Sequence, residues 1–177
     1  NEDLYGPYAE CLSKCEFVDE GKRQAYKFDA RMCALNRIGT KAADFRFEDR
    51  NGRVRRLHEI KAEFTVLFFS NPGCEACMEI INALKNTPQI TSLTASGKVA
   101  VLNIYIDEDL EAWRSYMPIY PEEWFNGFDP DFVIRTDVLY NVRAIPSLYL
   151  LDKDKNVIMK DAVTERVLDF FSRFVEQ

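Results

Sequence analysis

The sequence lacks the features of several large protein classes. None of its apolar runs approaches the roughly 18–20 residues that span a bilayer, so we expect the chain not to cross a membrane. The formal charge of −6, without a long basic run, argues against nucleic acid as a partner. Five cysteines are too few for a fold built on disulfides, and their odd number leaves at least one thiol without an intramolecular partner.

Metal ligands are also scarce. His58 is the only histidine, and the cysteines other than Cys74 and Cys77 lie far upstream of that pair. A structural zinc site needs four ligands, usually from two cysteine pairs or from one pair and histidines. We therefore expect no metal site, and we expect His58 to be a surface or turn residue without a catalytic role.

The composition indicates one domain with a small appendage. Apolar residues make up 47% of the 177 residues and aromatic residues 13%, which is enough to fill a core. The chain starts at Asn1 without a Met. We therefore expect a processed or trimmed chain, in which any signal peptide or lipid anchor has been lost upstream of residue 1.

Residues 1–38 carry a helical pattern that the rest of the chain does not share. Apolar residues recur at helical spacing over residues 5–18 and again over residues 25–35, and Asp19-Glu20-Gly21 interrupts them. We expect an N-terminal helical hairpin over residues 1–38, packed against a second domain over residues 39–177.

Three cysteines fall in this expected hairpin. Cys11 and Cys15 are four residues apart on one helix face, where Cβ atoms lie about 5–6 Å apart and an unstrained disulfide does not form. One interpretation is that Cys11, Cys15 and Cys33 are buried free thiols. The alternative is a Cys11–Cys33 bridge across the hairpin.

The pattern after residue 38 is that of an α/β protein with a mixed sheet. Residues 64–70 and 99–106 are nearly continuous apolar runs of strand length, typical of strands buried on both faces, and we expect them to be parallel neighbours. The sheet should have about five strands, with helices on both faces. Further strands are expected at 45–47, 54–57, 147–151 and 157–159, helices at 75–84, 131–140 and 163–175, and a loop at 117–130.

Cys74 and Cys77 lie where a buried strand gives way to a helix. At that point the Cys74 sulfur would face the unpaired N–H groups and the positive end of the helix, which lowers the pKa of a thiol. Cys77 follows one turn later on the same side, within reach of a disulfide. Because so short a loop makes a weak structural bridge, the spacing favours a redox-active pair.

Other short segments match one family. Arg143-Ala144-Ile145-Pro146-Ser147 lies directly before a predicted strand, downstream of the cysteine pair. With Cys74-Glu75-Ala76-Cys77, it makes residues 39–177 resemble the thioredoxin-like superfamily, specifically the TlpA/ResA-type thiol:disulfide oxidoreductases of bacterial cell envelopes. The remaining matching segments are Ala42-Ala43-Asp44-Phe45, Asn51-Gly52, Leu139-Tyr140-Asn141-Val142 and Leu151-Asp152-Lys153-Asp154.

The resemblance implies a thioredoxin-like fold and a thiol:disulfide oxidoreductase that needs no cofactor. It implies that Pro146 is cis and stacks against the disulfide, and that the Ile145 backbone pairs with a substrate peptide. The implied partners are a disulfide-containing protein substrate and a redox protein that donates electrons. The implied location is the periplasm or the outer envelope, with a lipoprotein as one form of attachment.

The chain departs from thioredoxins near the cysteines. Gly73 stands where thioredoxins usually have Trp, and Phe68 stands where thioredoxin has a buried acid. Glu79 is a candidate proton acceptor for Cys77, although a solvated helix carboxylate is the alternative. The charge of Glu75 should oppose the effect of the helix end on Cys74. We therefore expect a reductant or isomerase rather than a strong oxidant.

Two other functions remain open. A peroxiredoxin-like peroxidase is suggested by the Ala-Asp-Phe and Asn-Gly segments, but Asn71 stands where those enzymes typically have Thr. A non-catalytic adaptor domain with the hairpin as its docking element is the other, and the presence of Cys74, Cys77 and Pro146 counts against it.

The loop expected at 117–130 is rich in aromatic residues. We expect this group to anchor the core and the loop, and the alternative is that part of it forms an apolar rest for a substrate protein beside the active site. The group is Trp113, Met117, Tyr120, Trp124, Phe125 and Phe128.

Overall fold

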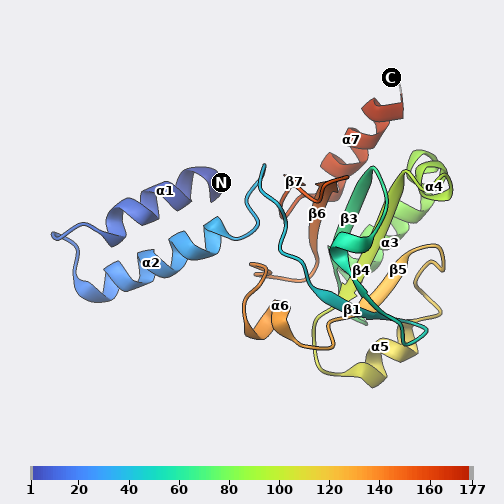
Figure 1. The fold of residues 1–177 in the computed structure, drawn as a ribbon, viewed down its shortest axis with the longest axis horizontal. Coiled ribbons are helices and arrows are strands. Elements are labelled where there is room, and N and C mark those ends of the chain that lie inside the picture. Colours follow the sequence, from blue (N-terminus) through green and yellow to red (C-terminus); the bar gives the residue numbers. More distant parts are fainter. Residues whose placement is uncertain (1, 176–177) are drawn as a thin grey trace.

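The computed structural model describes residues 2–175. Seven strands form one mixed sheet in the order β2-β1-β5-β4-β3-β6-β7, which is wider than the expected five strands (Figure 1). The strands are β1 (Arg46–Asp49), β2 (Val54–Arg56), β3 (Phe64–Phe69), β4 (Val99–Tyr105), β5 (Phe125–Phe128), β6 (Ser147–Asp152) and β7 (Val157–Met159).

The centre of the sheet is formed by β3 and its two neighbours. β3 and β4 are parallel and adjacent, which confirms the prediction from their apolar runs, and Phe64 pairs with Val99 at the start of their register. β6 lies antiparallel on the other side of β3. All side chains of β4, and all of β3 except Phe64, are buried. Burial on both faces explains why these strands read as continuous apolar runs.

Helices cover both faces of the sheet, as expected. On one face, α3 (Glu75–Asn86), α4 (Pro88–Ala95), α5 (Leu110–Tyr116) and α7 (Thr164–Val175) enclose a core cluster that includes Phe68, Cys77, Ile81 and Phe171. On the other face, α6 (Val133–Thr136) helps to cover a second cluster that includes Phe45, Phe69, Tyr140 and Tyr149. The fold is thioredoxin-like, with a two-helix hairpin at its N-terminal end.

The region expected as a loop contains β5. This strand pairs with β4 in parallel and with β1 in antiparallel orientation, but Asn126 and Gly127 interrupt its apolar pattern. The structure requires glycine there, because a Cβ on Gly127 would lie 2.7 Å from the Glu48 carbonyl oxygen. The close approach of the β5 and β1 backbones requires glycine at position 127, and glycine interrupts the apolar pattern from which a strand is predicted.

The helices also differ from their expected bounds. The helix expected at 131–140 is only α6, because Phe132 and Val138 on its two sides have φ angles of 54° and 50° in the left-handed region. α4 is a further helix, in a segment for which the sequence pattern predicts no element. It begins at Pro88, at the first helical position where proline is favourable.

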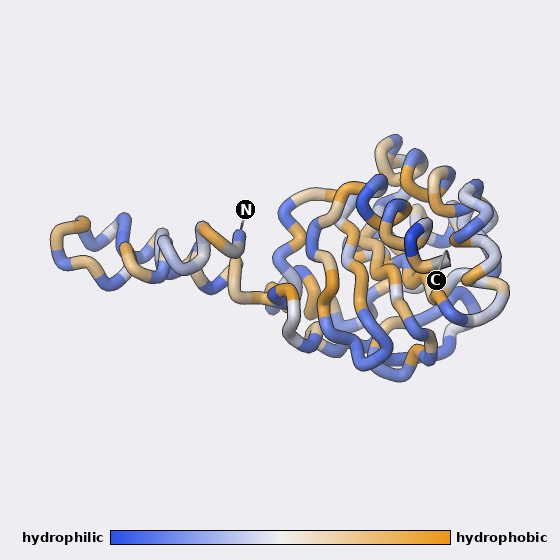
Figure 2. Tube along the Cα trace, turned by 90° about the horizontal axis from the view of Figure 1, so that it is seen from above, coloured by the Kyte–Doolittle hydropathy of each residue, from blue (hydrophilic) through white to orange (hydrophobic). Residues whose placement is uncertain are grey.

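The N-terminal hairpin is formed by α1 (Glu2–Ser13) and α2 (Glu20–Ala34). The expectation that it packs on the body is wrong: it projects as an arm and only its base reaches the sheet domain (Figures 1 and 2). Tyr8 and Phe28 of the helical apolar pattern are exposed, and so is Leu4 before it. The two helices approach closely at Gly6, where a Cβ would lie 3.1 Å from the Cβ of Cys33, and the rings of Tyr8 and Tyr26 also meet between them.

The three hairpin cysteines are free thiols. Cys33 is buried, Cys15 is partly buried and Cys11 is exposed, so the Cys11–Cys33 bridge is not formed and only one of the three thiols is buried.

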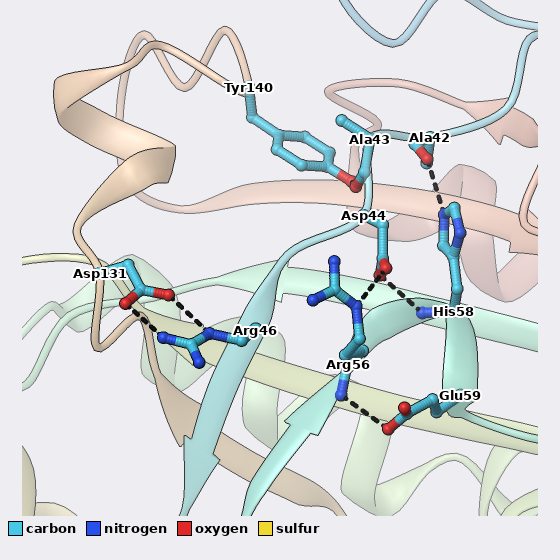
Figure 3. A network of polar contacts seen from close by, with 9 residues as sticks. All are labelled: Ala42, Ala43, Asp44, Arg46, Arg56, His58, Glu59, Asp131 and Tyr140. Atoms are coloured by element: carbon cyan, nitrogen blue, oxygen red, sulfur yellow. Dashed lines mark hydrogen bonds and ion pairs between the residues drawn. The ribbon is translucent and has the colours of Figure 1, made fainter.

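A network of polar contacts fastens the segment that joins the hairpin to β1 (Figure 3). The Tyr140 hydroxyl donates to the Ala43 carbonyl at 2.6 Å, and His58 Nε2 lies 2.8 Å from the Ala42 carbonyl. The Asp44 carboxylate accepts from the His58 amide at 3.0 Å. His58 lies in the short 3-10 helix η1 (Leu57–Glu59), where its contacts hold the chain in place.

Among residues 2–175, no helix combines the length and the apolar character needed to cross a membrane. The same residues contain no group of three or more His, Cys, Asp or Glu side chains placed to hold a metal ion.

Candidate functional site

The cysteine pair lies at the start of α3. Cys74 is the N-cap residue of this helix, and its sulfur accepts a hydrogen bond from the Cys77 amide at 3.1 Å. The two cysteines form a disulfide with their Cα atoms 5.2 Å apart. Cys74 is partly exposed, whereas Cys77 is 1% exposed and packs in the core cluster under α3. Only the first sulfur therefore faces both solvent and the helix end.

The Ile145–Pro146 peptide bond is cis, the isomer that the resemblance implies. Ser147 follows it and pairs with Phe69, the last residue of β3. The loop that carries Pro146 therefore lies beside the end of the strand that leads to Cys74. Ile145 and Cys74 both pack against the core cluster on the face that α3 covers, and the Ser147–Phe69 pair puts the Pro146 loop and the turn before Cys74 at the same end of β3.

The two candidate auxiliary carboxylates are in solvent. Glu75 and Glu79 are both exposed on α3, while Phe68, which takes the place of the thioredoxin acid, is fully buried. The surroundings of Cys77 in the core cluster are apolar and aromatic side chains. Glu79 is therefore exposed to solvent, whereas Cys77 is buried.

A buried polar chain near the site was missed by sequence reasoning. The Ser70 hydroxyl donates to Asn103 Oδ1 at 2.5 Å, and Asn103 Nδ2 donates to Asn126 Oδ1 at 3.2 Å. By strand alternation these residues lie on the face of β3, β4 and β5 that α3 covers. Burial raises the pKa of the neighbouring Tyr120 hydroxyl, which faces Ser70 and Asn103. The sequence signal for this chain is one polar residue at the end or in the middle of each apolar strand: Ser70 after β3, Asn103 in β4 and Asn126 in β5.

A cleft of about 320 Å³ lies beside Ile145. Asp107, which follows β4, is at one side of it and forms an ion pair with Arg135 of α6. The Asp107 carboxylate also accepts from Asn71 Nδ2 at 2.6 Å. The turn that holds Cys74 is thus tied to one wall of this cleft.

The residues of the aromatic group at 113–128 divide between core anchoring and a position near the cysteine pair. Trp113, Tyr120, Trp124 and Phe128 are buried in the core cluster that also holds Cys77, as core anchoring requires, whereas Phe125 packs on the opposite cluster. Met117 is only partly buried and packs against the same cluster as Cys74. Tyr116, which the sequence analysis did not single out, does the same.

Comparison with known proteins agrees with this arrangement. Residues 62–157 match a family model described as Thioredoxin-like. A thioredoxin-like protein from Bacteroides caccae is 38% identical with a TM-score of 0.94; the match covers all of this chain and 63% of that one. The C-terminal domain of an uncharacterized protein from Bacteroides fragilis is 45% identical with a TM-score of 0.76, covering 78% of this chain and 99% of that domain.

A more distant structure is a domain of a possible thiol-disulfide isomerase from Cytophaga hutchinsonii. It is 26% identical with a TM-score of 0.64, and the match covers 81% of this chain and 96% of that domain. No protein with a curated description matches the chain. Because the family match takes in more than half of the 177 residues, the chain belongs to the thioredoxin-like family.

Proposed function

We propose that the protein is a thiol:disulfide oxidoreductase that acts on protein disulfides through Cys74 and Cys77. The observation that carries this proposal is the asymmetry of the pair: Cys74 is partly exposed at the N-cap of α3, and Cys77 is buried one turn behind it. A thiol at a helix N-terminus has a lowered pKa and reacts as the thiolate. No cofactor is required for this chemistry.

The reaction has two exchange steps. The Cys74 thiolate attacks one sulfur of the substrate disulfide, forms a mixed disulfide and releases the other substrate sulfur as a thiolate, which takes up a proton. Cys77 then loses its proton and attacks the Cys74 sulfur, which releases the second substrate thiol. Two electrons pass from the dithiol to the substrate, and the Cys74–Cys77 disulfide is left. A redox partner protein must then reduce that disulfide.

The direction of exchange is part of the proposal. Glu75 places a negative charge next to Cys74 in the first turn of α3, and this charge opposes the stabilisation of a thiolate by the helix end. A thiolate that is only moderately stabilised favours reduction or isomerisation over strong oxidation. The Cytophaga relative, described as a possible thiol-disulfide isomerase, supports the same direction. Glu79 is assigned only a secondary role, through its charge on the exposed side of α3.

Substrate binding is assigned to the loop before β6. The Ile145 backbone would pair with an extended substrate chain, and Pro146 would cover the disulfide. The cleft beside Ile145 gives that chain a path away from Cys74. In this proposal residues 39–177 form the catalytic domain and residues 1–38 form the hairpin. The place of action is the bacterial periplasm or outer envelope, where protein disulfides persist.

The proposal is tested with two assays and three variants. The reduced protein should reduce insulin disulfides and consume little hydrogen peroxide. Cys77→Ser should trap a mixed disulfide with the substrate on non-reducing gels, because attack persists and resolution is lost. Cys74→Ser should neither turn over nor trap, and Cys33→Ser should turn over normally.

Other results would support the alternatives. Peroxide consumption without insulin reduction would indicate a peroxidase. The absence of both activities would indicate an adaptor domain. A Cys77→Ser variant that traps nothing, together with an inactive Cys33→Ser variant, would show that the chemistry belongs to other thiols.

A further inference from the structure

We infer that the N-terminal hairpin positions the substrate-binding loop, and that Glu2 is the positioning residue. The inference rests on the proposed function, because it concerns how Ile145 and Pro146 are held for substrate. Its basis is a set of contacts from the base of the hairpin to residues 139–143, the segment that leads directly into Ile145.

Glu2 is the centre of these contacts. Its Oε1 atom accepts from Arg143 Nη2 at 2.9 Å and from Asn141 Nδ2 at 3.1 Å. Its Oε2 atom lies 2.6 Å from Lys160 Nζ. One carboxylate in the first turn of α1 thus joins two residues of the loop segment to a third residue just after β7.

The other helix of the hairpin holds the same segment. Asn36, which follows α2, donates from Nδ2 to the Leu139 carbonyl at 2.9 Å and accepts from the Ala43 amide at 2.7 Å. Lys160 Nζ also donates to the Leu35 carbonyl at 2.7 Å. The segment is therefore fastened at Leu139 by Asn36, in the chain that leaves α2, and at Arg143 by Glu2 of α1.

The contact of Glu2 with Lys160 differs from an ordinary surface ion pair, whereas the Arg143 side chain is 57% exposed. The Lys160 side chain is only 7% exposed and that of Glu2 is 28% exposed, so solvent screens the pair weakly. The Glu2 carboxylate is an ion-pair partner of Lys160 rather than a hydrogen-bond acceptor. Without Glu2, the Lys160 ammonium would keep its hydrogen bond to the Leu35 carbonyl but would have no carboxylate partner among the described residues. Removal of one member of such a buried group is more disruptive than loss of an exposed pair.

Packing does not replace the polar contacts at this junction. A cavity of about 570 Å³ lies between the hairpin and the body, lined in part by Glu2, Cys33, Arg143 and Lys160. Tyr140 is held separately, by burial in the second core cluster and by its hydrogen bond to the Ala43 carbonyl. Because the hairpin otherwise projects away from the sheet, the orientation of its base and the positions of the Asn141 and Arg143 side chains are coupled through the contacts of Glu2. Displacement of the hairpin would therefore move Arg143, two residues before Ile145.

The experiment compares Glu2→Ala with Glu10→Ala. Glu10 lies on the same helix and pairs with Lys14 at an exposed position, so it is a matched control for the loss of one α1 carboxylate. Glu2→Ala should raise KM for insulin roughly three- to ten-fold, with little change in kcat and none in the rate at which the reduced protein reacts with a small aryl disulfide. Glu2→Gln, which keeps an oxygen acceptor for Arg143, should recover part of the loss.

A second readout keeps the inference separate from the proposed function. Amide hydrogen exchange of residues 139–145 should be faster in Glu2→Ala than in wild type and unchanged in Glu10→Ala, whether or not the protein reduces insulin. Failure of wild type to reduce any disulfide would overturn the proposed function alone. Equal exchange in the two variants, or equal loss of activity toward insulin and the small disulfide, would overturn the positioning role of Glu2.

Discussion

The hydroxyl oxygen of Tyr116 lies 3.5 Å from the position that a Cβ on Gly73 would occupy. Gly73 directly precedes Cys74 and has a φ of 73°, in the left-handed region that favours glycine. Tyr116 is the last residue of α5, which is anchored by the buried Trp113 packed against Phe128. An aromatic side chain therefore stands beside the first cysteine, although it comes from a different element than the Trp of thioredoxins.

This relationship predicts that Tyr116 contributes to substrate binding. Tyr116→Ala should raise KM for a protein disulfide and leave the reaction with a small aryl disulfide nearly unchanged, because the ring offers apolar surface near Cys74 without touching the dithiol chemistry. The change in binding should be about 1–2 kcal/mol, the size of a moderate hot spot. Phe17→Ala, which removes a fully exposed ring far from the site on the hairpin turn, is the control and should change neither reaction.

Gly73 itself allows a second test. Gly73→Ala places a Cβ in the left-handed region, which costs about 1–2 kcal/mol of stability. Gly97 has the same φ of 73° and open space around its Cβ position, so Gly97→Ala is matched for backbone strain. Urea denaturation should show a similar loss of stability in both variants. Only Gly73→Ala should also slow insulin reduction, because only it alters the turn before Cys74; equal rates would show that this turn tolerates change.

Much of this architecture could be predicted, and the misses have common physical causes. The patterns of β3 and β4 are dominated by burial, so local sequence and global structure agree. β5 is decided by backbone contact at Gly127, and α6 is shortened by Phe132 and Val138 in left-handed conformations. Both features depend on tertiary context that a single sequence does not display.

The site shows the same division between features set by the local sequence and features set by tertiary contacts. The positions of Cys74, Cys77 and the cis Ile145–Pro146 bond agree with short motifs in the sequence. Glu2 was not singled out, because its partners lie more than a hundred residues away in the chain and nothing local distinguishes it from other surface carboxylates. Nothing in the local sequence sets Tyr116 apart from the other aromatic residues near it, and its position beside Gly73 comes from the packing of α5.

The lowered pKa of Asp49 predicts a pH-dependent contribution of this residue to stability. Burial disfavours its charge, but hydrogen bonds from the Arg53 and Asn51 amides and from Arg55 outweigh this effect and lower its pKa. A lowered pKa stabilises the fold above the unfolded-state pKa of about 3.9, and the stabilisation is lost as the pH falls through the folded-state pKa. Asp49→Asn should therefore lower the free energy of unfolding by about 1 kcal/mol at pH 7.

The control for this change is Asp137→Asn, at an exposed carboxylate. Denaturation at pH 7 and near pH 3 measures both variants. The deficit of Asp49→Asn should shrink at the lower pH, and Asp137→Asn should remain close to wild type at both. A deficit of Asp49→Asn that stayed constant with pH would mean that lost packing, rather than the charge, is responsible.

The burial of the Lys155 side chain predicts that replacing it with an apolar residue should stabilise the protein. The residue is 2% exposed, and its Nζ atom has no hydrogen-bond partner within residues 2–175. Burial lowers the pKa of the Lys155 ammonium, although the charges of Asp152 and Asp154 oppose the shift. Lys155→Met keeps the length of the side chain and removes the buried charge, so it should raise the free energy of unfolding at neutral pH by about 1 kcal/mol.

The sign of the pH effect distinguishes charge from packing. The unfolded chain binds the proton more tightly than the folded protein does, so wild type gains stability as the pH rises from the folded-state pKa toward the unfolded value of about 10.4. The advantage of Lys155→Met should therefore be greatest at neutral pH and should shrink as the pH rises toward the unfolded-state pKa of about 10.4. Lys153→Met, at an exposed position of the same turn, should show no such advantage. An advantage of Lys155→Met that did not change with pH would trace the gain to packing, and a loss of stability would show that the ammonium is well solvated in the folded protein.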